Sequence, residues 1–182
     1  MTSYRIKNSH GLTATEIRAI LQAWDVTAWN TMDTLQFREA FSQSEFHLLS
    51  DSSGLLCIAR INFDLSIRIA ATIYPFPEFV GLAAISKNKG YGKTLIGHII
   101  AELKRRNMEC IGFCRSEVRA FYEKCTVPLL YDKAKYLLEK EQQDWNNVTD
   151  DDDIIILNVS EAHHNILRRL SPIHPGYLIF ES

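Results

Sequence analysis

The sequence of 182 residues has few cysteines, and it has no apolar run long enough to cross a membrane. Its cysteines, at positions 57, 110, 114 and 125, form no C-x-x-C pair, and two lie inside apolar runs, which favours buried reduced thiols. Cys110 and Cys114 would share a strand face about 13 Å apart, too far to bind one metal ion. The N-terminus has no apolar leader segment, so we expect a cytoplasmic protein without a membrane partner.

An excess of one charge sign is also missing, because the formal net charge is only −2. Nothing in that balance points to a nucleic-acid partner. With 46% apolar and 23% charged residues, the composition is ordinary for a globular protein, so we expect one domain over 1–182. Charge is uneven, however, because five aspartates (144 and 150–153) form a stretch without a base. Such a run is usually a solvated loop, and the alternative is that it attracts a cationic amine.

Hydrophobic spacing predicts two helices near the N-terminus, followed by strands. Thr13 and Glu16 fit a capping box that starts the first helix near residue 14, and a second helix is expected over 34–41. Beyond residue 45 the pattern becomes rich in branched residues and is broken by the turn DSSG at 51–54. We expect an antiparallel meander of FHLLS (46–50), LLCIARINF (55–63) and LSIRIAA (65–71).

A strand, a loop, a helix and a second strand follow over 79–114. FVGLAAI at 79–85 is short and apolar throughout, which predicts a strand buried on both faces. After the loop SKNKGYGKT, apolar residues recur at helical spacing from 95 to 103, and ECIGFC at 109–114 has a strand pattern. The two strands should be parallel, with a right-handed crossover and a ligand at their carboxyl ends.

The C-terminal part contains weaker patterns. Ser116 is expected to cap a helix that bears Tyr122 on its apolar side, and His163 and His164 are interpreted as surface residues. No pattern brings a thiol and an imidazole together as a nucleophile and its base. We further expect a helix over 133–142, a strand in IIILNV, a short helix over 165–170 and a strand in YLIF.

The loop can be compared with known phosphate-binding patterns. A Walker A loop needs glycine where Lys87 stands, and a dinucleotide fingerprint needs glycine or alanine where Leu95 stands. What remains is a basic residue, two spacers, Gly90, one spacer and Gly92 at the start of a helix. Glycines let the backbone approach a pyrophosphate, and helix N–H groups and three lysines (87, 89 and 93) add positive charge. The alternative is that this glycine-lysine loop is only a solvated connection between the strand and the helix.

This hexapeptide, KNKGYG at 87–92, resembles the [RQ]-x-x-G-x-[GA] acyl-CoA loop of the GNAT N-acetyltransferases. In that family a buried strand precedes the loop, and an amphipathic helix, a parallel strand and a helix with a Phe-Tyr pair follow. Phe121 and Tyr122 match the pair, so the likeness covers 79–125. It implies an α+β fold whose mixed, mostly antiparallel sheet is flanked by helices and has one parallel strand pair splayed around acetyl-CoA.

The resemblance also implies roles for individual residues. Backbone N–H groups of the strand at 79–85 would bind pantetheine and polarise the thioester carbonyl. Tyr122 would protonate the departing thiolate. The alternative is that Tyr122 is only a core residue on the apolar face of its helix. No metal is implied. The residues expected to bind acetyl-CoA are Leu82, Ala84, Lys87, Asn88, Lys89, Gly90, Tyr91, Gly92, Lys93 and Thr94.

A second likeness, to the aminoglycoside 2′-N-acetyltransferase branch, concerns the acceptor. That branch has a glutamate before the loop at the amine site, and Glu78 matches it if the loop is aligned without gaps. With a shorter loop the matching position is Val80, which has the same strand parity. Glu78 would remove the proton that an alkylamine carries at neutral pH. The likeness suggests a cationic amine such as an aminoglycoside or a polyamine.

Taken together, the sequence predicts an N-acetyltransferase that transfers acetyl from acetyl-CoA directly to a primary amine of a small molecule. A homodimer is left open. One rival function is a P-loop-like nucleotide-binding protein, which Lys87 disfavours. Another is a catalytically silent acyl-CoA-binding or interaction protein of the same fold.

Overall fold

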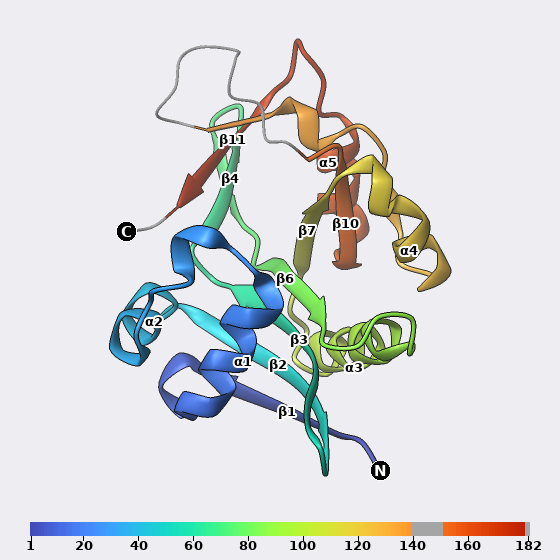
Figure 1. The fold of residues 1–182 in the computed structure, drawn as a ribbon. Coiled ribbons are helices and arrows are strands. Elements are labelled where there is room, and N and C mark those ends of the chain that lie inside the picture. Colours follow the sequence, from blue (N-terminus) through green and yellow to red (C-terminus); the bar gives the residue numbers. More distant parts are fainter. Residues whose placement is uncertain (140–150, 181–182) are drawn as a thin grey trace. The chain divides into compact units, whose positions relative to one another are not determined.

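The structure is a computed structural model that describes residues 1–139 and 151–180 (Figure 1). The chain divides into two compact units, Met1–Asn62 with Phe79–Ile99 and Phe63–Glu78 with Ile100–Ser182. None of the described helices is both long and apolar enough to cross a membrane.

The first unit is built on an antiparallel sheet. β1 pairs with β2, β2 pairs with β3, and β6 lies next to β3, where Ile85 N–H donates to Leu56 O over 2.9 Å. The sequence does not predict β1, because polar residues separate its few apolar ones in SYRIKN. The elements of the first unit are β1 (Ser3–Asn8), α1 (Ala14–Trp24), α2 (Thr34–Ala40), β2 (Ser44–Asp51), β3 (Gly54–Asn62), β6 (Glu78–Ala84) and α3 (Tyr91–Arg105), with 3-10 turns η1 (Ser9–Gly11) and η2 (Thr27–Trp29). Two of these elements are divided between the units, because Glu78 of β6 and the part of α3 from Ile100 onward belong to the second unit.

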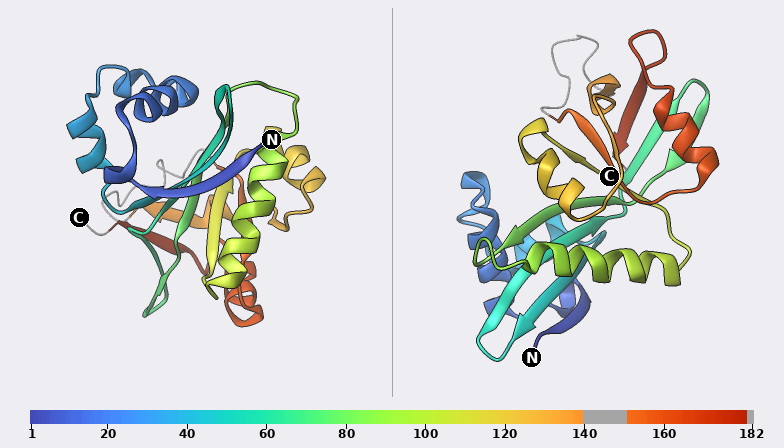
Figure 2. Two further views of the ribbon diagram at one scale, coloured as in Figure 1. Left: turned by 90° about the horizontal axis from the view of Figure 1, so that it is seen from below. Right: turned by 90° about the vertical axis from the view of Figure 1, so that its right-hand side faces the viewer.

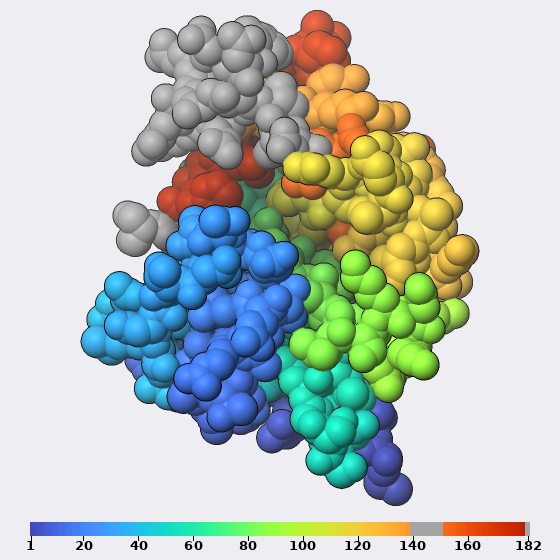
Figure 3. Space-filling model, viewed as in Figure 1, coloured from blue at the N-terminus to red at the C-terminus, as the bar shows by residue number. Residues whose placement is uncertain are grey.

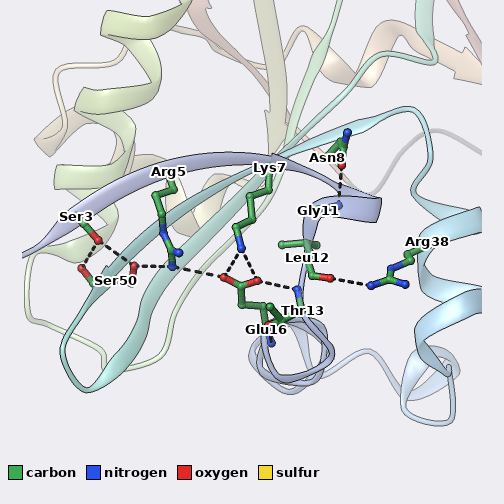
Figure 4. Close-up of polar contacts among 10 residues, drawn as sticks. All are labelled: Ser3, Arg5, Lys7, Asn8, Gly11, Leu12, Thr13, Glu16, Arg38 and Ser50. Atoms are coloured by element: carbon green, nitrogen blue, oxygen red, sulfur yellow. Dashed lines mark hydrogen bonds and ion pairs between the residues drawn. The ribbon is translucent and has the colours of Figure 1, made fainter.

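A capping box starts α1, as the sequence predicts (Figure 4). Thr13 Oγ1 accepts the N–H of Glu16 over 3.2 Å, and the Glu16 carboxylate accepts the N–H of Thr13 over 2.8 Å. The same carboxylate pairs with Lys7 Nζ at 2.8 Å. Glu16 therefore satisfies the start of the helix and also joins α1 to β1.

α1 and α2 lie on one side of this sheet (Figure 2). Aromatic side chains contribute much of the core of the first unit. Phe37 and Phe46 are fully buried, and Phe41 is 5% exposed. The Trp24 ring lies edge-on to Phe41, with ring centres 5.5 Å apart. Trp29 contacts both Trp24 and Phe41 edge-on. These rings fix the end of α1 and the following turn against the sheet.

β6 is kinked at Gly81, whose φ is +67°. Trp24 lies directly against this glycine, and its Nε1–H donates to Gly81 O over 2.6 Å. A Cβ at position 81 would stand 2.8 Å from the indole nitrogen. The kink thus requires glycine both for its backbone conformation and for the close approach of the ring.

The second unit contains two groups of paired strands. β10 lies between β7 and β8, antiparallel to both, while β4 lies between β5 and β11 (Figure 1). The elements are β4 (Leu65–Ile69), β5 (Thr72–Pro75), β7 (Cys110–Cys114), α4 (Arg119–Lys124), β8 (Leu129–Leu130), β9 (Leu137–Glu139), β10 (Asp153–Asn158), α5 (Glu161–Arg168) and β11 (Gly176–Phe180), with 3-10 turns η3 (Ser116–Val118) and η4 (Ala134–Tyr136). The strands expected in IIILNV and YLIF are confirmed.

The expected meander therefore ends at β3. Its third strand, β4, pairs instead with β5 and β11, because Leu65 and Ile67 are buried in a core with Phe76 and Leu178. The strand expected over 79–85 and the one over 109–114 fall in different units, so their parallel pairing stays a prediction.

The prediction of a helix over 133–142 is wrong for residues 133–139, the part that the structure describes. Residues 134–136 form a 3-10 turn, and residues 137–139 form β9, which runs parallel to β11; residues 140–142 lie outside the described residues. The Leu137 side chain is fully buried in the core of the second unit. Burial and strand pairing here outweigh the helix propensity of the segment.

Two smaller expectations about helices also change. Ser116 does not cap α4 but begins η3, and its N–H donates to Asp152. α5 begins at Glu161, earlier than expected, after the N-cap Ser160. His163 is more than a surface residue, because its ring bonds the Glu109 carboxylate and lies edge-on to Tyr74 and Phe76.

The end of the aspartate run is structural. Asp153 is fully buried, and its carboxylate accepts two hydrogen bonds of 2.7 Å from Arg119 and one of 2.8 Å from the N–H of Asp132. Asp152 accepts the N–H of Ser116 over 2.7 Å. The hydrogen bond from the Ser116 N–H, followed by those from the Ser116 side chain and from Lys135, lowers the pKa of Asp152 to about 2. These two residues are therefore not a solvated loop, while positions 144 and 150 lie outside the described residues.

We expect Asp153→Asn to lower the urea midpoint of unfolding, because an amide leaves the Arg119 guanidinium without its bidentate carboxylate partner. Asp132→Asn is the control, since the Asp132 side chain is 58% exposed and its carboxylate lies 3.8 Å from Arg119. The control should change the midpoint by less than half as much. Equal shifts in the two variants would contradict a structural role for the buried pair.

We expect Gly81→Ala to destabilise the protein by about 1–3 kcal/mol, because the side chain meets the Trp24 ring at a positive φ. The matched control is Gly97→Ala in α3, where a Cβ would meet no atom within 4 Å. Alanine there should stabilise by about 0.5–1 kcal/mol, since glycine is a poor helix former. Opposite signs in urea unfolding are the expected result, and a neutral Gly81→Ala would contradict the tight contact.

Candidate active site

β6 carries the first group of predicted site residues. Phe79 is buried, but the residues from Val80 to Ala84, with Leu82 among them, are only half-buried. The expectation of a strand buried on both faces is therefore wrong for this part. An apolar strand that stays half-exposed retains surface that a ligand can cover.

The loop after β6 is exposed from Ile85 to Gly90 and leads into α3 (light green in Figure 3). Asn88 and Gly90 both have positive φ, and a Cβ on Gly90 would meet nothing within 4 Å. The N–H of Thr94 donates to Gly90 O over 3.0 Å, as the first helical bond of α3. The N–H groups of residues 91–93 precede that bond, so they are the orphan donors of the helix start.

Three lysines surround this helix start. Lys87 and Lys89 lie in the loop and Lys93 in the first turn of α3, and all three are exposed. Within the described part of the chain, none of them forms a hydrogen bond or an ion pair. Backbone donors, glycines and lysine charge are thus gathered in one segment, which is the chemistry that a pyrophosphate needs.

Tyr122, the predicted acid, belongs to the second unit and lies on α4. Its side chain is 7% exposed, and among the described residues its hydroxyl has no hydrogen-bond partner. Burial raises the pKa of Tyr122 above its ordinary value, and the neighbouring thiols Cys114 and Cys125 raise it further. The phenol is therefore held in its protonated form, as an acid and a core tyrosine both require.

All four cysteines are buried and none forms a disulfide, as the sequence predicts. Burial raises the pKa of Cys57 to about 11. Burial, and then the charges of Asp153 and Asp151, raise the pKa of Cys114 to about 12. Such thiols are poor nucleophiles at neutral pH, because the reactive thiolate is scarce.

Glu78, the predicted base, is the first residue of β6 and is half-buried, as is Val80. Glu78 belongs to the second unit and Val80 to the first, so the choice between the two alignments stays a prediction. Asp152 and Asp153, at the described end of the aspartate run, already have cationic partners. Lys135 lies 3.2 Å from the Asp152 carboxylate, and Arg119 neutralises Asp153.

The first unit also contains a pocket next to the middle of β6, which the sequence patterns do not predict. Its lining includes two tryptophans, Trp24 and Trp29, and one charged residue, Arg60. The available signal was Gly81, since an isolated glycine in a strand pattern marks a kink or a close approach. Within the described residues, no group of three or more His, Cys, Asp or Glu side chains could hold a metal ion.

No protein-family model matches the sequence, and no curated protein matches it either. Solved structures do match. The GNAT family N-acetyltransferase YhbS of Escherichia coli, in complex with CoA, has 12% identity over 99% of this chain and 89% of its own, with a TM-score of 0.61. An N-acetyltransferase of Staphylococcus aureus has 12% identity over 86% and 98%, with a TM-score of 0.55.

An acyl-CoA N-acyltransferase of Pseudomonas aeruginosa is similar to the same degree, with 13% identity over 84% of this chain and 96% of its own and a TM-score of 0.53. At such low identity these matches concern the fold. The chain therefore has the α+β fold of the GNAT N-acetyltransferases, which the loop motif and its flanking elements predict.

Proposed function

We propose that the protein is an N-acetyltransferase that transfers the acetyl group of acetyl-CoA to a primary amine of a small molecule. The observation that carries the proposal is the segment in which half-exposed β6 leads into the glycine-lysine loop at the start of α3. The fold of the GNAT N-acetyltransferases supports it, and one similar structure was solved with CoA.

The start of α3 suits the pyrophosphate of acetyl-CoA. The orphan N–H groups of residues 91–93 are directed out of the helix end, and no side chain on Gly90 or Gly92 blocks them. Lys87, Lys89 and Lys93 add charge opposite to the phosphates. In the proposed complex, backbone groups of β6 around Leu82 and Ala84 bond the pantetheine arm, because a half-exposed strand can pair with an extended ligand.

The proposed reaction is direct transfer. The amine nitrogen attacks the thioester carbonyl carbon, the C–N bond forms, and the C–S bond breaks. Backbone N–H groups of β6 stabilise the oxyanion that develops on the carbonyl oxygen. Glu78, directly or through water, takes the proton that the ammonium group must lose before attack, and the second proton that the nitrogen loses on forming the amide passes to solvent. Tyr122 gives its proton to the departing thiolate and regains one from solvent.

Two rival functions make different predictions about ligands. A P-loop-like protein would bind ATP in a Mg²⁺-dependent manner, although Lys87 stands where that loop needs glycine. A silent acyl-CoA-binding protein of the same fold would bind acetyl-CoA and release no thiol with any amine. Calorimetry and a thiol-release assay therefore separate the three functions.

We expect the purified protein to bind acetyl-CoA with micromolar affinity in calorimetry, and Gly92→Glu to weaken binding by at least about tenfold, since a carboxylate would repel the phosphates. The control is Gly97→Glu, the same change farther along α3 at a position open to solvent. It should bind as the wild type does. Binding of ATP with Mg²⁺ in place of acetyl-CoA would overturn the proposal.

Tyr122→Phe should lower kcat by roughly a hundredfold, the usual contribution of a general acid, while the Kd for acetyl-CoA changes less than about twofold. Because the Tyr122 hydroxyl has no partner among the described residues, its removal should not lower the melting temperature. Tyr131→Phe is the control, in which a surface hydroxyl bonded to Glu123 is lost. An unchanged kcat in Tyr122→Phe would leave this tyrosine as a core residue only.

A further inference from the structure

The pocket beside β6 is a cavity of about 330 Å³ whose lining lies wholly in the first unit. This volume is at the small end of the range for ligand sites, which fits a small molecule. The pocket is bounded by the end of α1, the turn that follows it, β3 and the kinked part of β6. Its described lining residues are Ala23, Trp24, Val26, Trp29, Arg60, Val80, Gly81, Leu82 and Ala83.

The aromatic wall of the pocket is held rigidly. The Trp24 indole is fixed at one edge by its hydrogen bond to Gly81 O and is packed against Phe41. Trp29 lies edge-on to Trp24, with ring centres 5.6 Å apart, and also contacts Phe41. Both tryptophans are half-buried, so part of each ring remains available to a ligand. A preformed aromatic wall binds apolar or aromatic groups with little loss of side-chain entropy.

The described lining of the pocket contains one charged residue, Arg60, and no carboxylate. The Arg60 guanidinium lies over the Phe41 ring at 4.8 Å and donates to Ser44 Oγ over 3.1 Å, which holds it in place on β3. An additional ammonium group brought by a ligand would therefore find no carboxylate among these lining residues.

The position of the pocket connects it with the reaction. Val80, Gly81, Leu82 and Ala83 of β6 form one side of it, and β6 is the strand proposed above to bond the pantetheine arm and the thioester. A molecule bound in the pocket therefore lies alongside that strand. This places an amine on a short chain within reach of the strand, while its carbon skeleton contacts the tryptophans.

We infer that the pocket binds the carbon skeleton of the acceptor, and that the preferred acceptor is a monoamine with an aromatic or branched aliphatic body. This inference rests on the proposed function and refines it. The aminoglycoside or polyamine suggested by the second family likeness is disfavoured, because such molecules carry several positive charges and little apolar surface.

The test compares four primary amines in a thiol-release assay with saturating acetyl-CoA: 2-phenylethylamine, 3-methylbutylamine, spermidine and kanamycin. We expect kcat/KM for the first two to exceed that for the polycations by at least about tenfold. Trp29→Ala should lower kcat/KM for 2-phenylethylamine by about tenfold or more, and Trp29→Phe should restore most of it.

Leu35→Ala is the matched control, because Leu35 lies on the neighbouring helix α2, is 63% exposed and does not line the pocket. It should leave all four kcat/KM values unchanged. Thermal unfolding of each variant verifies that it is folded. A faster reaction with spermidine or kanamycin, or equal effects of Trp29→Ala on all four amines, would overturn the inference and leave the proposed function standing.

A second measurement does not depend on turnover. Titration of 2-phenylethylamine, followed by tryptophan fluorescence, should saturate in the wild type and in Leu35→Ala but not in Trp29→Ala, and spermidine should give no saturable change. If the protein binds no acetyl-CoA and 2-phenylethylamine still binds, the proposed function fails and the pocket stands. If 2-phenylethylamine does not bind, the inference about the pocket fails.

Discussion

The hydrogen bond from Trp24 Nε1 to Gly81 O is the contact on which the pocket beside β6 depends. It holds the end of α1 against β6. It also gives a hydrogen-bond donor to the Gly81 carbonyl, which the kinked strand would otherwise leave without one. The kink at Gly81 exists only because the residue lacks a Cβ. The close contact between the Trp24 ring and Gly81 therefore has two results. It forms one wall of the pocket, and it leaves β6 irregular and half-exposed.

The aspartates at 152 and 153 show how a charge run can be used inside a fold. Asp153 begins β10 and holds Arg119, which begins α4, while Asp152 accepts the N–H of Ser116 at the start of η3. A β-strand and the segment that leads to Tyr122 are thus joined by carboxylates, where apolar contacts would be less directional. The cost of burying Asp153 is offset because three hydrogen bonds satisfy its two oxygens.

Local patterns predicted those parts of the structure that local interactions determine. The capping box of α1, the turn between β2 and β3, and the loop before α3 depend on residues close together in sequence, so periodicity and motif spacing found them. β9 depends on β11, which is about forty residues farther along the chain, so the local pattern at 137–139 predicts a helix. The contact between Trp24 and Gly81 joins residues 57 positions apart, and no local pattern reports the pocket it creates.

Positive charge has two different environments in the first unit, and the difference separates two kinds of binding. The loop lysines are exposed and, among the described residues, unpaired, so they attract an anion from solution and lose little by exchanging water for phosphate oxygens. Arg60 is half-buried, stacked on Phe41 and bonded to Ser44, so its charge is fixed in an apolar wall. Burial therefore changes what a positive charge can do, because the exposed lysines can exchange water for phosphate oxygens, whereas Arg60 is committed to contacts within the protein.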